Sequence, residues 1–513
     1  MTKIARAIFQ APPFPRAATA QLVCPGGDDG DEASADRLIA AMRARRVGGQ
    51  FWLPAGKAKR AAPIDPWSGR DAAPCYSASD PAALLDAIVG HPVQVQGEGL
   101  FADLSGLRPG EEKTEAIIRA HVLRNLLCGV TYLSPFTAER IDALQLVDIL
   151  GAWRDLIDEN RSIAAAFGFA QWKRETVGPL LWGGRSVPFR SARNRTLATL
   201  SESASIAVWK ARVPSHFLKE LETGPRRIIE IEDGFIRSAG LGADCIPPLS
   251  IVVDGLGVHY DPSRPSRLEE MLARGEFTPG DLDRATRLRS WIVREGVSKY
   301  SVGNSATLVR RDKGRRHILV IGQVEDDRSV QFGGGEIQSN LELLHRVRAR
   351  APEAYVIYRP HPDVEAGYRR GAIPERIALK LADAIDSGSS IGALIDLVDE
   401  VHVITSLAGF EALMRGKAVT THGTPFFAGW GLTTDLAPVP SRRGIPRSLD
   451  ELVAATLLQY PRYLDPVTNL PCPAEVMILR LLAGNRRQND ALVPLRQFFG
   501  WMKRARQRFL DKR

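Results

Sequence analysis

Residues 401–417 of the chain read VHVITSLAGFEALMRGK. The apolar first half predicts a buried strand that ends at Thr405 and Ser406, and the second half predicts a helix that begins at once. Hydroxyl groups and free backbone N–H groups therefore meet at the positive end of a helix, where a phosphate would bind. Glu411, on the second turn of this helix, is placed to reach a ribose hydroxyl of the same nucleotide. The alternative interpretation is an ordinary helix cap beside a surface carboxylate.

Short apolar segments alternate with helical patterns from about Gly168 onward, in two series. The predicted strands are residues 205–209, 227–231 and 250–253 in the first series and 317–322, 354–358, 400–405 and 418–422 in the second. This alternation predicts parallel sheets built from right-handed strand–helix–strand units. We therefore expect an α/β protein with two Rossmann-type doubly wound domains, whose ligands bind beyond the carboxyl ends of the strands.

Five parts are expected along the chain. They are an N-terminal α/β region at 1–110, a helical connector at 111–165, a first Rossmann-like domain at 166–310, a second at 311–465, and a basic amphipathic helical tail at 466–513. The tail mixes Phe and Trp with Lys and Arg between residues 495 and 510, which is typical of a helix lying on an anionic membrane surface. A helix packed on the parent domain, or a frayed terminus, is the alternative.

Composition excludes several classes of protein. With 44% apolar and 25% charged residues, the chain is neither disordered nor a polytopic membrane protein. No apolar run is long enough to span a bilayer and the first residues lack the core of a secretory signal, so we expect a cytoplasmic location. The net charge of +9 suits an anionic partner, but the cations are dispersed among carboxylates, so we expect no nucleic acid. Dinucleotide and P-loop glycine patterns are absent, which disfavours a dehydrogenase or an NTPase.

Residues 359–363, RPHPD, follow a predicted strand. Two prolines, the second of them Pro362, stiffen the backbone around His361, and Arg359 adds a permanent cation. A rigid imidazole next to a guanidinium suits a phosphate diester. A lone histidine is otherwise more often structural or simply exposed.

A third segment, IEIEDGFIRS at residues 229–238, runs from a strand into Glu232 and Asp233, and the glycine that follows permits a sharp turn. In a parallel sheet this places at least one carboxylate in the cleft, where it could act as nucleophile or base. The alternative is a solvated turn with Arg237 as ion-pair partner. A glycine-rich loop at 321–336 lies where a loop would cover a donor nucleotide.

Together these segments resemble the bacterial capsule polysaccharide synthesis and export family of the KpsC/LipB type, whose members are transferases of the sugar acid Kdo. The resemblance extends from about Gly168 to Tyr463 and rests on separated motifs in the family's order. These motifs are FAQWKR at 169–174, EDGFIRS at 232–238 with GLG at 240–242, VHYDPSRPSRLE at 258–269, QVEDD at 323–327, RPHPD at 359–363, SLAGFEAL at 406–413 and PFFAGWGLT at 425–433.

The resemblance implies a GT-B-like pair of Rossmann domains that uses CMP-β-Kdo as donor and a Kdo-bearing phosphatidylglycerol glycolipid as acceptor, without a cofactor or a metal. It also implies peripheral contact with the inner membrane and with capsule-assembly proteins. By resemblance, the catalytic carboxylate is Asp233, with Glu232 beside it, and substrate binding falls to Arg237 and Ser238. The residues assigned to the donor are Gln323, Arg359, His361, Pro362, Thr405, Ser406 and Glu411.

A β-linked donor and a β-linked product imply net retention at the anomeric carbon, which two successive displacements through a carboxylate ester would give. Longer relatives carry two transferase modules, whereas this chain has one recognisable set of motifs, which predicts a single linkage type. Two alternatives stay open. One is a transferase or epimerase for another nucleotide-activated sugar on the same scaffold, and the other is a non-enzymatic scaffold for capsule assembly or export.

Overall fold

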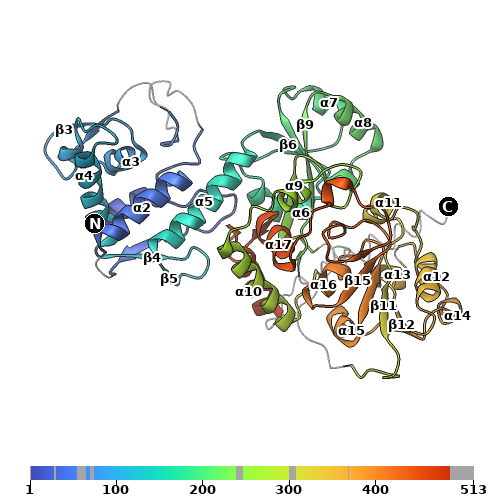
Figure 1. Cartoon of the computed structure of the whole chain (residues 1–513). Coiled ribbons are helices and arrows are strands. Elements are labelled where there is room, and N and C mark those ends of the chain that lie inside the picture. The colour runs from blue at the N-terminus through green and yellow to red at the C-terminus, as the bar shows by residue number, and fades with distance from the viewer. Residues whose placement is uncertain are drawn as a thin grey trace. The chain divides into compact units, whose positions relative to one another are not determined.

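The structure is a computed structural model that describes residues 2–27, 30–54, 65–69, 74–238, 246–299, 308–367 and 369–485. The chain forms two compact units (Figure 1). Unit 1 comprises Met1–Ala164, Glu175–Pro188 and Leu464–Cys472, and unit 2 comprises Ala165–Arg174, Phe189–Tyr463 and the residues from Pro473 onward. The domain ranges expected from sequence stay predictions, and the aromatic and basic part of the expected tail lies outside the described residues.

Unit 1 is mainly helical. Its helices are α1 (Thr2–Ile8), α2 (Glu32–Arg45), α3 (Pro81–Val89), α4 (Glu112–Val122) and α5 (Ala143–Asn160), and its small sheets are β1 (Val23–Pro25) with β4 (Val130–Leu133) and β5 (Arg140–Ile141), and β2 (Cys75–Ser77) with β3 (Gln94–Gln96). The side chains of Asp80 and Asp142 cap α3 and α5. The expected connector is therefore not purely helical, because the residues between α4 and α5 form strands, the first of which pairs with β1.

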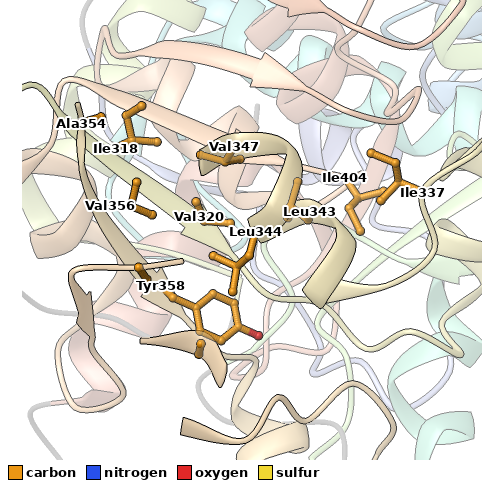
Figure 2. Close-up of a cluster of buried hydrophobic side chains, with 12 residues drawn as sticks. Ile318, Val320, Ile337, Leu343, Leu344, Val347, Ala354, Val356, Tyr358 and Ile404 are labelled. Atoms are coloured by element: carbon orange, nitrogen blue, oxygen red, sulfur yellow. The ribbon is translucent and has the colours of Figure 1, made fainter. Parts of the chain in front are cut away.

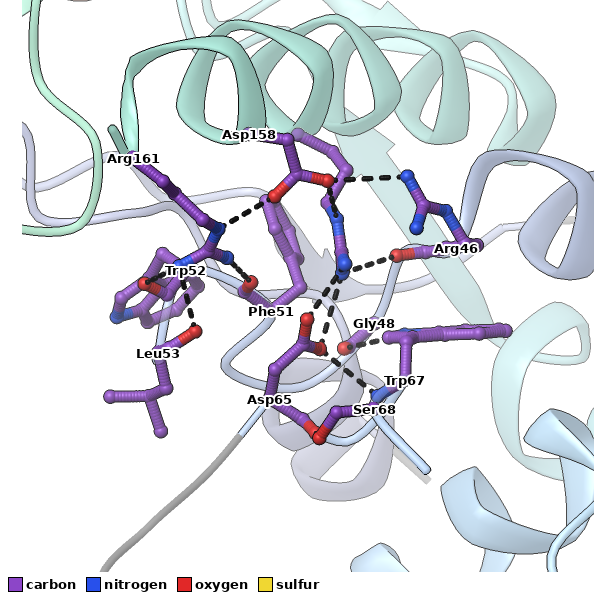
Figure 3. A network of polar contacts seen from close by, with 11 residues as sticks. Arg46, Gly48, Phe51, Trp52, Leu53, Asp65, Trp67, Ser68, Asp158 and Arg161 are labelled. Carbon is purple, nitrogen blue, oxygen red and sulfur yellow. Dashed lines mark hydrogen bonds and ion pairs between the residues drawn. The ribbon is translucent and has the colours of Figure 1, made fainter. Parts of the chain in front are cut away.

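A buried charge network joins α5 to Arg46 and Asp65, which follow α2 in unit 1 (Figure 3). Arg154 is 4% exposed and donates to both carboxylate oxygens of Asp65, at 3.1 and 2.7 Å. Its Nε donates to Asp158 at 2.8 Å, and Asp158 also accepts from Arg46 and Arg161. Because a buried charge is costly unless it is paired, this network specifies how the loop sits on the helix.

The second half of unit 2 holds a fully parallel sheet of six strands. Their order is β13 (Ala384–Ile385), β12 (Tyr355–Arg359), β11 (His317–Ile321), β14 (Glu400–Val403), β15 (Ala418–Thr421) and β16 (Thr434–Asp435). Counted along the chain this is 3-2-1-4-5-6, the doubly wound order, which reverses between β11 and β14. Ligands bind at such a reversal, beyond the carboxyl ends of the strands.

Helix α12 (Asn340–Arg350) covers one face of this sheet (Figure 2). Leu343, Leu344 and Val347 of the helix pack with Val320 of β11 and Val356 of β12, and all five side chains are fully buried. The helix buries residues three and four apart, which is the spacing of one helical face. The other helices of this half are α11 (Arg328–Gly333), α13 (Pro362–Glu365), α14 (Glu375–Ala378), α15 (Ile391–Leu397) and α16 (Ala408–Met414).

The first half of unit 2 has a mixed sheet, ordered β17 (Pro461–Leu464), β10 (Ser250–Asp254), β9 (Arg227–Asp233), β8 (Ser205–Val208), β6 (Ile163–Phe167) and β7 (Phe189–Arg190). β8 and β9 are parallel, as expected. β10 runs antiparallel to β9 and to β17, which corrects the expectation of an all-parallel sheet. The described residues between β9 and β10 contain no helix, and antiparallel neighbours can be joined without a crossover helix.

The segment that follows β16 returns from the second half of unit 2 to the first. α17 (Leu449–Val453) packs on α10 (Pro279–Glu295), and β17 joins the first sheet. Glu269 on α9 (Arg267–Arg274) is paired with buried Arg443, from the segment that follows β16. These contacts hold both halves in one unit. Within the described residues, no helix has the length and apolar character needed to cross a bilayer.

We expect the substitution Arg154→Met to lower the free energy of unfolding by about 3–5 kcal/mol, because it leaves the Asp65 carboxylate buried without its partner. Urea denaturation followed by tryptophan fluorescence measures the change. Arg287→Met, which removes an exposed pair with Asp283, is the control and should cost less than about 1 kcal/mol. The double variant Asp65→Leu/Arg154→Met should regain part of the loss, and an equal effect of Arg154→Met and the control would contradict the assigned role.

Candidate active site

A cavity of about 660 Å³ lies between the two halves of unit 2, at the carboxyl ends of β9, β11, β12 and β14. Its volume is within the range of sites that hold cofactors and nucleotide-sized ligands. Nine of the residues singled out from the sequence line it: Glu232, Asp233, Gln323, Arg359, His361, Pro362, Thr405, Ser406 and Glu411. Segments that are up to 179 positions apart in sequence, from Glu232 to Glu411, therefore meet in one place.

Asp233 is the last residue of β9 and is held between two cations. Its Oδ1 lies 3.3 Å from Lys173 Nζ, and its Oδ2 lies 3.0 Å from Arg237 Nε. Burial alone would raise the pKa of this carboxyl, but the charges of Lys173 and Arg237 outweigh burial and hold the pKa below its usual value. Asp233 is thus an ionised carboxylate at the cavity wall and not part of a solvated turn.

Glu232 differs from its neighbour in protonation. Burial, and then the negative charge of Asp233, raise the pKa of the Glu232 carboxyl well above its ordinary value. Its Oε1 accepts the backbone N–H of Asp233 at 3.0 Å. Two adjacent carboxyl groups with pKa values moved in opposite directions are suited to different tasks, one as a nucleophile and the other in proton transfer.

Lys173, in the first turn of α6 (Gln171–Leu180), was not among the residues singled out from sequence. Its ammonium group lies 3.3 Å from the centre of the Trp209 ring as well as beside Asp233. Burial lowers the pKa of Lys173 to about 8, so it remains mostly charged at neutral pH. The motif at 169–174 contains this lysine, and that was the signal available in the sequence.

Arg237 and Ser238 lie behind Asp233 and do not line the cavity. Arg237 is 1% exposed, and besides Asp233 it contacts the Ser238 hydroxyl at 2.9 Å and the carbonyl of Ile246 at 2.8 Å. The geometry makes Arg237 a positioning residue for Asp233. The expected substrate-binding role of Arg237 and Ser238 stays a prediction.

Gln323 and Thr405 meet where the strand order reverses. The Gln323 amide accepts the Thr405 N–H at 2.8 Å and donates to the Thr405 hydroxyl at 3.0 Å. The Gln323 backbone is held in turn by Asn340 at 2.8 Å. The amide therefore joins the ends of β11 and β14 and positions Thr405. Ser406 lines the cavity next to it, and its hydroxyl accepts the backbone N–H of Ala408 at 3.3 Å, at the start of the seven-residue helix α16.

His361 and Arg359 lie at the end of β12, as expected. His361 Nδ1 accepts the backbone N–H of Asp363 at 3.1 Å, which puts the proton of the neutral ring on Nε2. Burial lowers the pKa of His361, so the neutral ring is favoured and serves as a hydrogen-bond donor. Arg359 is oriented by the Asp386 carbonyl at 2.8 Å.

Glu411 is not the surface carboxylate of the alternative interpretation. It lies on α16 and lines the cavity, and burial raises its pKa to about 7. Its carboxyl accepts the backbone N–H of Lys299 at 3.4 Å.

Lys299 also lines the cavity but follows α10 in a segment without a motif, so only the fold reveals it. Among the described residues, no cluster of three or more His, Cys, Asp or Glu side chains is arranged to hold a metal ion.

The part of the chain that forms the cavity is similar to known proteins. A family described as "Capsule polysaccharide biosynthesis protein" matches residues 204–290 and 280–463. The capsule polysaccharide modification protein LipA of Neisseria meningitidis serogroup B is 38% identical over 366 residues, which is 70% of this chain and 51% of LipA. The lipopolysaccharide-processing protein LpsZ of Rhizobium meliloti is 45% identical over 322 residues, 61% of this chain and 72% of LpsZ. The chain thus spans about half the length of LipA.

Two solved structures are similar, and both are of KpsC from Thermosulfurimonas dismutans. One, described as a β-Kdo 2,7 transferase, has a TM-score of 0.52 and 35% identity, and the match covers 63% of this chain and 99% of that one. The other, described as a β-Kdo 2,4 transferase, has a TM-score of 0.54 and 30% identity, and covers 62% and 98%. Both likenesses agree with the GT-B-like arrangement of two Rossmann-type halves.

Glu411 generates a prediction about stability and pH. Its pKa is about 7 in the folded state and near its ordinary 4.5 in the unfolded state, so between these values only the folded state keeps the proton. Stability should therefore fall as pH rises through this interval, by on the order of 2 kcal/mol. Urea midpoints at about pH 5 and about pH 7.5 measure the slope.

The variant Glu411→Gln, which mimics the neutral side chain, should show a flatter dependence than the wild type. Glu353→Gln, at an exposed position, is the control and should keep the wild-type slope. If Glu411→Gln and the wild type lose stability equally over this interval, Glu411 does not retain its proton in the folded state.

Proposed function

Because the chain belongs to the capsule polysaccharide biosynthesis family, of the KpsC/LipB type, we propose that it is a retaining glycosyltransferase that moves Kdo from CMP-β-Kdo to a Kdo-bearing phosphatidylglycerol glycolipid. The similarity to two chains described as Kdo transferases supports the sugar, and the family match supports the capsule. The acceptor would bring the protein to the inner membrane and to other capsule-assembly proteins.

The observation that carries this proposal is that one cavity contains both an ionised carboxylate and a set of groups suited to a phosphate. The ionised Asp233 stands on the wall formed by the first half of unit 2. His361, Arg359 and the Thr405–Ser406 turn stand on the wall formed by the second half, at the carboxyl ends of its strands. A nucleotide phosphate on the second wall would present its sugar to the carboxylate on the first.

The first displacement forms a sugar ester. An Asp233 oxygen attacks C2 of Kdo, the bond from C2 to the phosphate oxygen breaks, and the electron pair leaves on CMP. His361 Nε2–H and the Arg359 guanidinium stabilise the charge that grows on the phosphate. Lys173 and Arg237 keep Asp233 ionised and oriented before the attack.

The second displacement transfers the sugar. An acceptor hydroxyl attacks C2 on the face that CMP left, the ester bond breaks, and the Asp233 carboxylate is regenerated, so the configuration is retained. The hydroxyl proton needs a base. Forming the ester removes the Asp233 charge, which is one cause of the raised pKa of Glu232, so Glu232 ionises more readily at this stage and can take the proton.

We expect Asp233→Asn to lower the transfer of Kdo to a synthetic Kdo-terminated acceptor by at least about 1000-fold, because the amide is a poor nucleophile. Intact mass measurement of the wild type mixed with CMP-Kdo should find one added Kdo, and peptide mapping should locate it at Asp233. His361→Ala should lower the rate by about 100- to 1000-fold through the loss of one donor to the phosphate.

Asp283→Asn, at an exposed position on α10, is the matched control and should retain full activity. Turnover of CMP-sialic acid but not of CMP-Kdo would replace the proposed donor with another nucleotide-activated sugar. Normal capsule formation in cells that carry Asp233→Asn would instead favour a non-enzymatic scaffold.

A further inference from the structure

The proposed donor poses an electrostatic problem. Kdo carries a carboxylate on C1, directly attached to the anomeric carbon that Asp233 has to attack. Asp233 is itself ionised, so two negative charges must come within a few ångströms of each other. A cation placed between the acidic pair and the phosphate side of the cavity would remove this repulsion. The cavity should therefore contain a residue that binds the sugar's own carboxylate.

Lys299 is at that place in the fold. Its carbonyl accepts the backbone N–H groups of Arg237 and Ser238, at 3.1 and 3.5 Å, on the first half of unit 2. Its own N–H donates to the Glu411 carboxyl, at 3.4 Å, on the second half. The residue is thus anchored by both halves, and it lines the cavity between them.

The charge of Lys299 acts on groups of both walls. It lowers the pKa of Glu232 and of Asp233 on one side and that of His361 on the other. Its ammonium group is therefore close enough to influence the attacking carboxylate and the residue assigned to the phosphate. C2 and C1 of the donor would lie between these two groups.

Two other cations near the cavity are engaged by groups of one wall. Lys173 pairs with Asp233 and is covered by the Trp209 ring. Arg359 is oriented by the carbonyl and the carboxylate of Asp386, at 2.8 and 3.6 Å. These contacts make Lys173 a partner of the nucleophile Asp233. They place Arg359 on the second half of unit 2, the wall assigned to the donor phosphate.

Arg328 and Arg369 also line the cavity, and both belong to the second half of unit 2. The Arg328 guanidinium lies 4.9 Å from the centre of the Phe332 ring, and Arg369 pairs with Asp326 at 3.2 Å. The Arg369 contact stays on the second half, whereas Arg328 also hydrogen-bonds to Tyr260 of the first half. Lys299 is the better candidate for a group attached to the anomeric carbon, because its carbonyl binds the backbone of Arg237, the partner of Asp233, and its charge acts on Asp233 itself.

We infer that the Lys299 ammonium binds the carboxylate attached to the anomeric carbon of the donor, and that Lys299 thereby selects sugar acids over uncharged nucleotide sugars. This inference rests on the function proposed above. The proposed function already assigns residues to the donor phosphate and a nucleophile to the sugar. The inference adds a third contact, which distinguishes sugar acids from uncharged sugars.

The test compares two donors, CMP-Kdo and its neutral C1 amide, with the wild type, Lys299→Met and Lys299→Arg. The wild type should favour the acid by roughly 10- to 100-fold in kcat/KM, the worth of a charge-assisted hydrogen bond. Lys299→Met should bring this preference close to 1, whereas Lys299→Arg should keep part of it. Lys380→Met, an exposed lysine on the same unit, is the matched control and should keep the wild-type preference.

Calorimetry with CMP alone separates the possible contacts and checks that the variant is folded. If Lys299 binds the sugar carboxylate, the affinity for CMP should change by less than about threefold in Lys299→Met. An unchanged preference for the acid, or a loss of CMP affinity as large as the loss of kcat/KM, would overturn the inference. A wild type that turns over neither donor but binds CMP would overturn the proposed function and, with it, the role of Lys299.

Discussion

Parallel strands of one sheet end at the same edge, and the site depends on this constraint. In the second half of unit 2, the ends of β11, β12 and β14 bring Gln323, His361 and Thr405 together from three separate segments. The Gln323 amide binds both the backbone and the hydroxyl of Thr405, so the strand ends are joined by polar groups as well as by the apolar core beneath them. A surface for an anion is thus a consequence of the strand order.

The opposite wall depends on the cost of burying charge. A carboxylate at the position of Asp233 is stable only with cations beside it, and these are Lys173 on α6 and Arg237 in the segment after β9. The same cluster separates the protonation states of Asp233 and Glu232, since the charge of one raises the pKa of the other. The ion pairs that allow Asp233 to be buried therefore also set the protonation states on which its proposed reaction depends.

The two units have different relations to the family. The family match at 204–463 covers most of both sheets of unit 2 and nearly all of the cavity, whereas unit 1 lies outside it. Unit 1 nevertheless has its own core and its own buried network around Arg154 and Asp65, so it is a folded body in its own right. Unit 2 contains the family match and the cavity, and unit 1 is stabilised separately. This division agrees with the single set of motifs in the sequence.

The sequence alone determined the α/β class, the strands of the second sheet and the loops after them, because apolar periodicity and local residue type report directly on strands, turns and strand ends. Those loops contain His361 and Ser406, and Asp233 is the last residue of β9 in the first sheet, which is why local patterns were enough to single these residues out. Tertiary structure decided the antiparallel direction of β10, the place of Lys173 and Lys299 at the site, and the burial of Arg237 behind Asp233. These features arise from contacts between residues far apart in the chain and from the loss of water around charged groups, neither of which a local pattern contains.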